Sequence, residues 1–570
     1  MDMMTRIAAL TADCLLSAWP EAEELPDACE IRGLLAVPPD PAMGYYAFPV
    51  FRLAKALRMA PPKIAQALCQ AWSHGDVARV EPVNGYMNFF LNRVNFARDT
   101  LGAILEAGER YGSSDLGAGK TICLDYSSIN IAKRFHIGHL STTMIGHSLK
   151  RIYDFLGYKT VSINHLGDWG TQFGKMICAY KAWGDRETIE RGGVDELVKL
   201  YVRFHQEAEQ DESLNEAARG WFKKIEDRDP EATALFEWFK KITLEEVQQV
   251  FDLMGIRFDS YAGESFYNDK MDRVVNELSE KGLLKLDQGA KIVDLSAYKM
   301  PPCIILRSDG ATLYATRDIA AALYRKDTYD FAKCLYVVAY QQDLHFRQWF
   351  KVVELMGYDW AKDLVHVSFG MVSGTEGAFS TRRGNMVKLR DVLNAAIEKT
   401  GEIMKEKSPD LENRDAVARD VGVGALVWNS LYNGRIKDVV FDWDTVLNFD
   451  GETGPYAQYT HARACSVLRK AQPQGEIDYS LLSDDESRGL IAALAAFPDA
   501  VREAMDKYEP YLVSRAVMAI CQSFNRFYYE QRIMADDAAE RNARLALTDA
   551  ARRVIAIGLG LVGLAAPERM

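Results

Sequence analysis

A strand–helix–strand pattern that begins at residue 121 constrains the fold more than any other feature. The apolar stretch TICLDYS (121–127) is followed by a loop and by a helical pattern over residues 140–156. A second strand pattern, GYKTVSINHLG (157–167), comes directly afterwards. Strand, helix and strand at this spacing form a βαβ unit, whose strands run parallel. We therefore expect a doubly wound parallel sheet, in which ligands bind at the carboxyl ends of the strands.

The chain is too long for a single hydrophobic core, and its 570 residues indicate three or four domains. We distinguish three. Residues 1–115 predict a small α/β domain that opens with an amphipathic helix. Residues 116–449 predict the sheet domain, with a charged helical insertion at about 181–255. Residues 450–570 predict an all-α domain, because only helical periodicity remains after residue 411. Other strand patterns are GYMNFFLN (85–92), CIILRSDG (303–310), CLYVVAY (334–340) and LVHVSFGMV (364–372).

Composition excludes several classes of protein. The chain is 48% hydrophobic and 26% charged, which is ordinary for a globular protein and excludes a mostly disordered one. No apolar run reaches the ~18–20 residues of a membrane helix, so we expect no membrane partner. Nine scattered cysteines without a CxxC pair argue against a zinc site and a disulfide framework, and favour a cytoplasmic protein. The net charge of −12 disfavours an overall nucleic-acid binder but leaves room for a local basic face.

A candidate phosphate site lies in SSINIAKRFHIGH (127–139), between the first strand and the crossover helix. His136 and His139 flank Gly138, and Lys133 adds a cation one turn earlier. A helix N-terminus offers free N–H groups to phosphate, and imidazoles can donate hydrogen bonds to phosphoryl oxygens. The alternative is that both histidines are surface residues or helix caps. A zinc site is less favoured, because no third ligand follows at a suitable spacing.

This stretch resembles the HIGH signature of class I aminoacyl-tRNA synthetases. The extended pattern SxNIAKxxHxGHL, continued by NHLGDWGTQFG (164–174), is similar to the arginyl-tRNA synthetase version. The resemblance extends over essentially the whole chain, with further motifs in the family's order: YAFPVFRLAKALR (46–58), GESFY (263–267), SDGATLYATRDIA (308–320), QDLHF (342–346), STRRGN (380–385), GPYAQYTHAR (454–463) and APERM (566–570). It implies a Rossmann-like catalytic domain, an N-terminal additional domain that contacts the tRNA elbow, and a C-terminal helical anticodon-binding domain.

The second class I signature, the KMSKS loop, is altered in this chain. The matching stretch begins at Ala378, so the first lysine of the pattern is missing, while Ser380 and Arg382 keep later positions. Family resemblance implies that Lys133, Arg382 or Arg383 supplies the missing charge on the leaving pyrophosphate. Taken alone, STRRGN favours a solvated basic turn, and the HIGH stretch upstream reverses that preference.

Two smaller departures lie near the histidines. Ile129 stands where the family usually has proline, and Ser141 stands where an arginine often follows the HIGH signature. Neither changes a histidine. Both leave the geometry around the phosphates and the substrate open.

A reader for free arginine needs carboxylates, because guanidinium presents its donors in a planar fork that a carboxylate matches. Tyr314 and Asp318 are four residues apart in a predicted helix and so share one face. Glu264 is a plausible second carboxylate. The alternative makes Tyr314 a core aromatic and pairs Asp318 with Arg317 or Arg325.

The family resemblance implies three sets of site residues. Two histidines are outside these sets: His345 is interpreted as structural, and His165 either lines the site or is a packed histidine. The implied catalytic residues are His136, His139, Lys133, Ser380 and Arg382. Implied ATP-binding residues are Gly138, His136, His139, Met371, Val372 and Arg383. Arginine-binding residues are implied at Ser128, Asn130, His139, Tyr314, Asp318, Gln342 and Glu264.

The C-terminal region interleaves aromatic residues with arginines, which can stack on bases and hold phosphates. A helical core with arginines on its rim is the alternative for these residues: Tyr456, Tyr459, Arg463, Phe524, Arg526, Tyr528 and Tyr529.

We therefore expect an arginine–tRNA ligase that binds L-arginine, ATP with Mg²⁺ and tRNA(Arg), holds no zinc, and is a monomer. The rivals are a synthetase of another specificity, a nucleotidylyltransferase, and a non-catalytic tRNA-binding paralogue, for which Ala378 is the one supporting feature.

Overall fold

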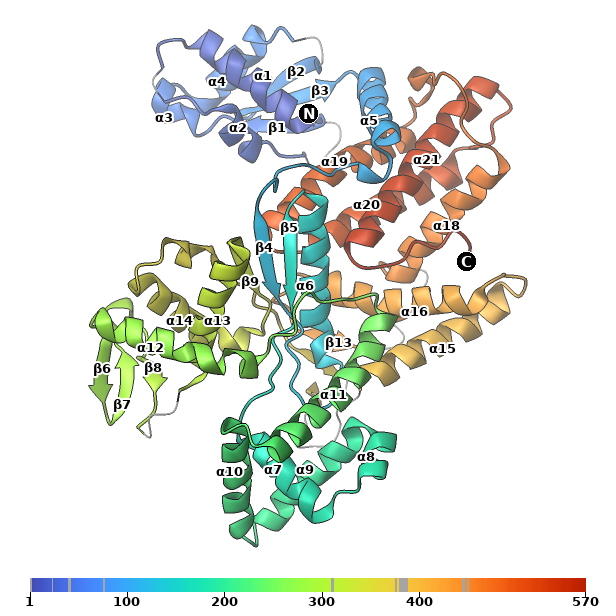
Figure 1. Ribbon diagram of the computed structural model, residues 1–570. Coiled ribbons are helices and arrows are strands. Elements are labelled where there is room, and N and C mark those ends of the chain that lie inside the picture. Colours follow the sequence, from blue (N-terminus) through green and yellow to red (C-terminus); the bar gives the residue numbers. More distant parts are fainter. Residues whose placement is uncertain are drawn as a thin grey trace.

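The computed structural model describes residues 3–22, 24–38, 43–74, 77–308, 312–374, 377–378, 388–442, 446–448 and 451–570. The N-terminal domain and the C-terminal helices lie side by side at one end of the molecule, the central sheet with helix α6 comes next, and the insertion helices form the opposite end (Figure 1). Within the described part of the chain, no helix combines the length and apolar composition needed to cross a membrane.

The N-terminal domain is a small α/β unit, as predicted. Its first helix buries Ile7, Thr11, Cys14 and Leu15 on one face, the spacing of an amphipathic helix. Strand β3 pairs antiparallel with β1 on one side and β2 on the other. The elements are α1 (Met3–Ala18), α2 (Ala28–Leu34), β1 (Tyr46–Pro49), α3 (Leu53–Leu57), α4 (Pro61–Ala71), β2 (Val77–Val83), β3 (Tyr86–Leu91) and α5 (Arg93–Ala107).

The central sheet confirms the predicted βαβ unit. Its strand order is β10-β9-β4-β5, and every neighbouring pair is parallel. From β4 the chain first adds β5 on one side and later β9 on the other, so the order reverses between β4 and β9, where such sheets open a binding crevice. The elements are β4 (Thr121–Asp125), α6 (Gly138–Phe155), β5 (Lys159–Ile163), β9 (Phe331–Tyr336) and β10 (Leu364–His366).

The insertion is helical, as predicted. Asp185 caps α8, while Asp229 caps α11 and is followed by proline at the first helical position. The capping aspartates and the proline therefore mark where individual helices of the insertion begin. The helices are α7 (Thr171–Trp183), α8 (Arg186–Gly192), α9 (Val194–Ala208), α10 (Ser213–Glu226) and α11 (Pro230–Leu253).

The strand predicted within CIILRSDG forms outside the central sheet. β8 (Cys303–Leu306) closes a separate antiparallel sheet with β6 (Leu284–Asp287) and β7 (Ala290–Val293). Helices η3 (Glu264–Lys270), α12 (Met271–Glu280), α13 (Tyr314–Tyr329) and α14 (Asp343–Leu355) surround this unit, with η5 (Tyr340–Gln342) before α14.

One expectation for the region after residue 411 is wrong. β13 (Val439–Phe441) is a strand, and it pairs in parallel with β11 (Val372–Gly374), which also pairs with β12 (Gly377–Ala378). A three-residue strand is too short to show an alternation of apolar and polar residues in the sequence. Whether it forms depends on the strand with which it pairs. The remaining elements are helices: α15 (Leu389–Lys407), α16 (Arg414–Leu431), α18 (Gly454–Lys470), α19 (Asp485–Lys507), α20 (Tyr511–Glu530) and α21 (Ala538–Leu561).

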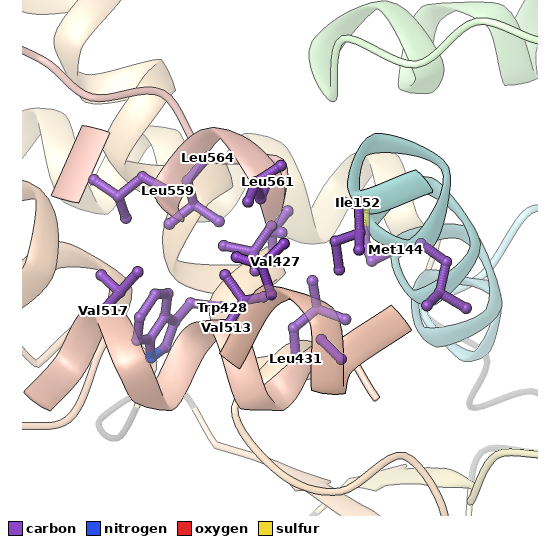
Figure 2. Close-up of a cluster of buried hydrophobic side chains, with 14 of the residues drawn as sticks. Met144, Ile152, Val427, Trp428, Leu431, Val513, Val517, Leu559, Leu561 and Leu564 are labelled. Carbon is purple, nitrogen blue, oxygen red and sulfur yellow. The ribbon is translucent and has the colours of Figure 1, made fainter. Parts of the chain in front are cut away.

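Helix α6 connects the sheet to the C-terminal helices. Figure 2 shows Met144 and Ile152 of α6 beside apolar side chains of α16, α20 and α21. Two side chains of α6 also donate to the end of α21: Ser148 Oγ to Leu561 O at 3.0 Å and Arg151 Nη1 to Gly560 O at 3.0 Å. The helix that begins at the candidate phosphate site is therefore fixed at its far end by the C-terminal helices.

Candidate active site

The loop after β4 has a strained backbone. Ser127, Ser128 and Ala132 have φ values of 70°, 44° and 58°, a left-handed region that non-glycine residues seldom occupy. Hydrogen bonds hold this conformation: the Ser127 N–H donates to Thr142 Oγ1 at 3.1 Å, and the Ala132 N–H donates to Thr243 Oγ1 at 3.0 Å. Such strain concentrates at functional sites. The sequence gives no glycine signal for it, so sequence reasoning missed it.

The loops after β4 and β5 are joined by main-chain bonds. The Gly167 N–H donates to Ile129 O at 2.8 Å, and the Ile131 N–H donates to Gly167 O at 3.1 Å. A Cβ at Gly167 would lie 2.4 Å from Asn130 Oδ1, which explains the glycine. The Ile129 N–H donates to Asn164 Oδ1 at 3.4 Å. Proline has no N–H, so the isoleucine at this position adds a bond that the family's usual residue could not make.

The two signature histidines lie side by side at the start of α6. Their ring centroids are 4.0 Å apart and their planes are tilted by 52°. The Gly138 N–H donates to His136 Nδ1 at 3.1 Å, so in the neutral ring the proton is on Nε2, which can donate to a ligand. A Cβ at Gly138 would lie 2.8 Å from His136 Cε1. Glycine is therefore required for this packing.

Burial sets the protonation of both rings. It lowers the pKa of His136 to about 4. For His139, burial together with the neighbouring His136 and Lys133 lowers the pKa to about 3. Both imidazoles are therefore neutral near pH 7. In this state they can donate hydrogen bonds to phosphate oxygens without carrying charge of their own.

Charged side chains connect the histidine loop with the insertion and with the residues after the KMSKS-like stretch. Arg134 Nε lies 2.9 Å from Asp195 Oδ1, and Lys388 Nζ binds the other oxygen of the same carboxylate. The Leu389 N–H donates to Phe135 O at 3.0 Å. The chain that leaves the second signature is thus attached to the first one.

The second signature itself lies mostly outside the described residues. Ser380, Arg382 and Arg383 belong to this part, so their roles stay predictions. Ala378 ends the described edge of β12, opposite Ser373 of β11. Lys133 is described and exposed, and its positive charge lowers the pKa of both His139 and Glu264. Its charge therefore reaches both the histidine pair and Glu264.

Asp318 has a hydrogen-bond partner that the sequence did not indicate. His345 Nε2 and Asp318 Oδ2 are 2.6 Å apart, and each side chain is 27% exposed. The alternative that pairs Asp318 with Arg317 or Arg325 is wrong. Arg317 Nη1 lies 3.5 Å from Glu264 Oε2, and Arg325 is bound elsewhere.

Glu264 lies close to other acids. Burial raises its pKa to about 7, and the charges of Asp318 and Asp168 also act in this direction, against Arg317 and Lys133. Carboxylates that repel one another in a half-open site form a place where a ligand cation is favoured. The structure thus brings Glu264 and Asp318 within electrostatic reach.

Asp125 at the end of β4 is a site residue that sequence reasoning did not select. Arg325 Nη2 donates to Asp125 Oδ2 at 2.8 Å, and Ser128 Oγ donates to Oδ1 at 2.8 Å. The ion pair is buried and connects α13 to the loop that holds Ser128. The sequence does contain a signal for Asp125, because it is an acid at the end of an otherwise apolar strand. A buried charge of this kind requires a partner.

The other predicted residues are more dispersed. Tyr314 is 65% exposed and lines a cavity of about 1150 Å³ between α10, α11 and α13. No described contact joins it to Asp318, so the expected convergence of the two side chains stays a prediction. Gln342 is exposed just before α14. Met371 is also exposed, and Val372 begins β11.

Family models match three parts of the chain. The catalytic domain of class I (R) tRNA synthetases matches residues 100–443, the DALR anticodon binding domain matches 457–570, and the arginyl tRNA synthetase N terminal domain matches 9–91. Solved structures show the same fold. The Thermus thermophilus arginyl-tRNA synthetase has a TM-score of 0.84 at 24% identity and covers 98% of this chain and 99% of its own. The Plasmodium falciparum arginyl-tRNA synthetase has a TM-score of 0.82 at 21% identity, covering 100% and 99%.

Curated relatives are much closer in sequence. The arginine–tRNA ligase of Alkaliphilus metalliredigens is 52% identical, over 95% of this chain and 96% of the relative. That of Clostridioides difficile is 53% identical over the same shares. The chain therefore belongs to the arginyl-tRNA synthetases, class I enzymes that charge tRNA with arginine.

Proposed function

We propose that His136 and His139 bind the phosphates of ATP during formation of arginyl-adenylate. The arginine carboxylate oxygen attacks the α-phosphorus, and the bond to the pyrophosphate oxygen breaks. A ribose hydroxyl at the 3′ end of tRNA(Arg) then attacks the adenylate carbonyl, and AMP leaves. The observation that carries this proposal is the pair of neutral imidazoles at the start of α6, beside the point where the strand order reverses. Fixed donors of this kind stabilise charge that develops on phosphate.

We infer that Lys133, with Arg382 and Arg383, replaces the lysine lost at Ala378. Lys133 is exposed, and its charge acts on both His139 and Glu264. Mg²⁺ enters with ATP, because it binds mainly through phosphates and water. Gly138, Met371 and Val372 complete the proposed nucleotide site.

We propose that Asp318 reads the guanidinium of arginine, with Glu264 as a second acid and Tyr314 beside them. Asp318 and Glu264 influence each other electrostatically, which supports a shared cationic ligand. Around the α-amino and carboxylate end of the substrate we place Ser128, Asn130, His139 and Gln342. The strained loop after β4 holds Ser128 there through its bond to Asp125.

We further propose that the C-terminal domain reads the anticodon of tRNA(Arg). The guanidinium of Arg463 lies 5.0 Å from the ring centroids of Tyr459 and Tyr528 and 5.2 Å from that of Tyr529. These side chains line a pocket of about 750 Å³ that Met570 also borders. Exposed aromatic faces around a cation suit an unstacked base.

Other residues from the predicted RNA-facing set have different surroundings. Phe524 is fully buried in the helical core, as the core alternative expected. Arg526 forms an ion pair with Glu486 at 3.2 Å. Tyr456 OH accepts a hydrogen bond from Asn525. We propose in addition that the N-terminal domain contacts the tRNA elbow, and that the enzyme is a cytoplasmic monomer.

Charging total tRNA with each labelled amino acid tests the specificity directly. Arginine is expected to give the only substantial charging. Arginine-dependent ATP–pyrophosphate exchange, measured with and without tRNA, then tests whether activation requires tRNA, as the family resemblance implies. Substantial exchange without tRNA would refute that requirement, while charging with another amino acid would refute the arginine pocket.

A further inference from the structure

Helix α13 provides two arginines as well as the proposed guanidinium reader. Arg317 is bound to Glu264 and Arg325 to Asp125, at 3.5 and 2.8 Å. Each of these cations therefore already has an acid of its own. Among the described residues, Asp318 forms no ion pair with a lysine or an arginine, and its partner is the imidazole of His345.

The kind of partner that Asp318 has affects how it can bind a substrate cation. A lysine or arginine paired with Asp318 would have to be displaced by the incoming guanidinium. An imidazole N–H instead orients the carboxylate through a single hydrogen bond. The contact uses one oxygen, Oδ2, and a carboxylate has about four lone-pair positions, so Oδ1 stays open to a ligand.

Orientation matters more for arginine than for a compact cation. Guanidinium binds carboxylate through two parallel N–H bonds and so depends on the rotation of the carboxylate plane. The terminal torsion of an aspartate side chain is broad, so a free carboxylate would populate many orientations. The bond from α14 to α13 restricts this rotation before the ligand arrives. Lysine is a point charge and gains less from such restriction.

We propose that His345 is a positioning residue that determines specificity for arginine. Its Nε2–H donates to Asp318 Oδ2, so that Oδ1 and the remaining lone pair of Oδ2 are presented to the two parallel N–H groups of the substrate guanidinium. This inference rests on the proposed role of Asp318. The sequence alone indicates a structural role for His345, and the bond to Asp318 gives it a role in substrate binding instead.

Aminoacylation kinetics with the full chain and tRNA test the proposal. His345→Leu is expected to raise the KM for arginine about tenfold, the scale of one hydrogen bond to a charged group. The kcat and the KM for ATP should stay within about twofold. The inhibition constant of lysine, measured as a competitor of arginine, should change less than the KM for arginine. His345→Gln, which keeps a side-chain N–H donor at this reach, should restore most of the arginine affinity.

A double-mutant cycle separates this role from general support of the fold. In an Asp318→Asn background, His345→Leu should add little to the KM for arginine, because its partner carboxylate is already gone. Equal increases in both backgrounds, or equal increases in the KM for arginine and for ATP, would mean a structural role and overturn the proposal. A wild-type KM in His345→Leu would overturn it as well.

His366 offers a matched control. This histidine is on β10, and its Nδ1 lies 3.0 Å from Oδ1 of Asp343 on α14, so it likewise contacts an aspartate of a neighbouring helix. His366→Leu should leave the KM for arginine unchanged. Failure of the proposed function has a different signature: Asp318→Asn alone would then leave the KM for arginine at its wild-type value, whatever His345 does.

Discussion

The two halves of the active site are organised by different means. On the phosphate side, the close packing of His136 on Gly138 and the burial of both imidazoles fix neutral donors. Around the proposed guanidinium readers, the backbone is helical, and the charged side chains are distributed into separate pairs. Ligand binding in the phosphate half therefore depends mainly on shape, whereas binding in the arginine half depends mainly on electrostatics. Mutations in the two halves should therefore affect different kinetic constants.

Loss of a signature histidine should give the largest effect. His136→Ala or His139→Ala is expected to lower kcat by about two to three orders of magnitude, the scale measured when one fixed donor to a developing charge is removed. For His136→Ala the KM for arginine should change little, because the acids on α13 and η3 are untouched. His139→Ala should raise this KM as well, because His139 is also placed at the carboxylate end of the substrate. Steady-state charging at saturating ATP measures this. Binding of tRNA is the control, and turnover near wild type would contradict the phosphate assignment.

Loss of the guanidinium reader should change the other constant. Asp318→Ala is expected to raise the KM for arginine about a hundredfold, since it removes a carboxylate that a substrate cation would otherwise bind. The KM for ATP should stay near wild type. Arginine titrations at saturating ATP and tRNA would show the shift. If both constants rose together, the two halves would not be separable in the way the comparison requires.

Most of the framework could be predicted from local sequence. The βαβ unit, the helical insertion and the position of α13 follow from periodicity and from signals such as Asp229 before Pro230. The loop between β4 and α6 could also be singled out, because its motif concentrates unusual residue types at a fixed spacing, while the roles of its residues stay predictions. The confirmed parts thus depend on contacts within about 40 residues of chain.

The parts that sequence reasoning missed depend on distant partners. β13 exists because β11, some 65 residues earlier, offers it an edge. The left-handed backbone conformation of Ser128 is held by contacts with the surrounding loops, and a serine in the sequence does not indicate such a conformation. The pairings of Arg317 and Arg325 were open for the same reason. An arginine on a helix can reach several acids. The packing of η3 and β4 against α13 determines which acid each of these two arginines binds.

The pH dependence of arginine binding tests whether the charge of Glu264 contributes to binding in the arginine half of the site. Burial raises the pKa of Glu264 to about 7, so the carboxyl takes up a proton as the pH falls below 7 and loses the charge that favours guanidinium. The KM for arginine should therefore rise as the pH falls from 8 to 6, by up to about tenfold per unit below the pKa. Glu264→Gln should have a higher KM that varies less with pH. An unchanged slope in this variant would exclude Glu264 as the group responsible.

His147 is a third buried histidine, on α6 but outside the proposed nucleotide site. It allows a test of whether burial is enough to keep His136 and His139 neutral. Burial lowers the pKa of His147 to about 3, and its Nε2 accepts a bond from Arg151. In the unfolded chain this ring would bind a proton below about pH 6.5. The unfolded state then holds more protons, so stability is present above pH 6.5 and is lost as the pH falls toward the folded pKa.

His147→Gln should reduce the loss of Tm between pH 7 and pH 5, corresponding to at most about 2 kcal/mol. It should leave the kcat at pH 7 close to wild type. If the substitution instead lowered kcat like His136→Ala, the distant end of α6 would take part in the chemistry, and the division between a functional pair and a packed third histidine would fail. If the Tm profile did not flatten, burial of this ring would not be what keeps it neutral, and the same explanation would be weakened for His136 and His139.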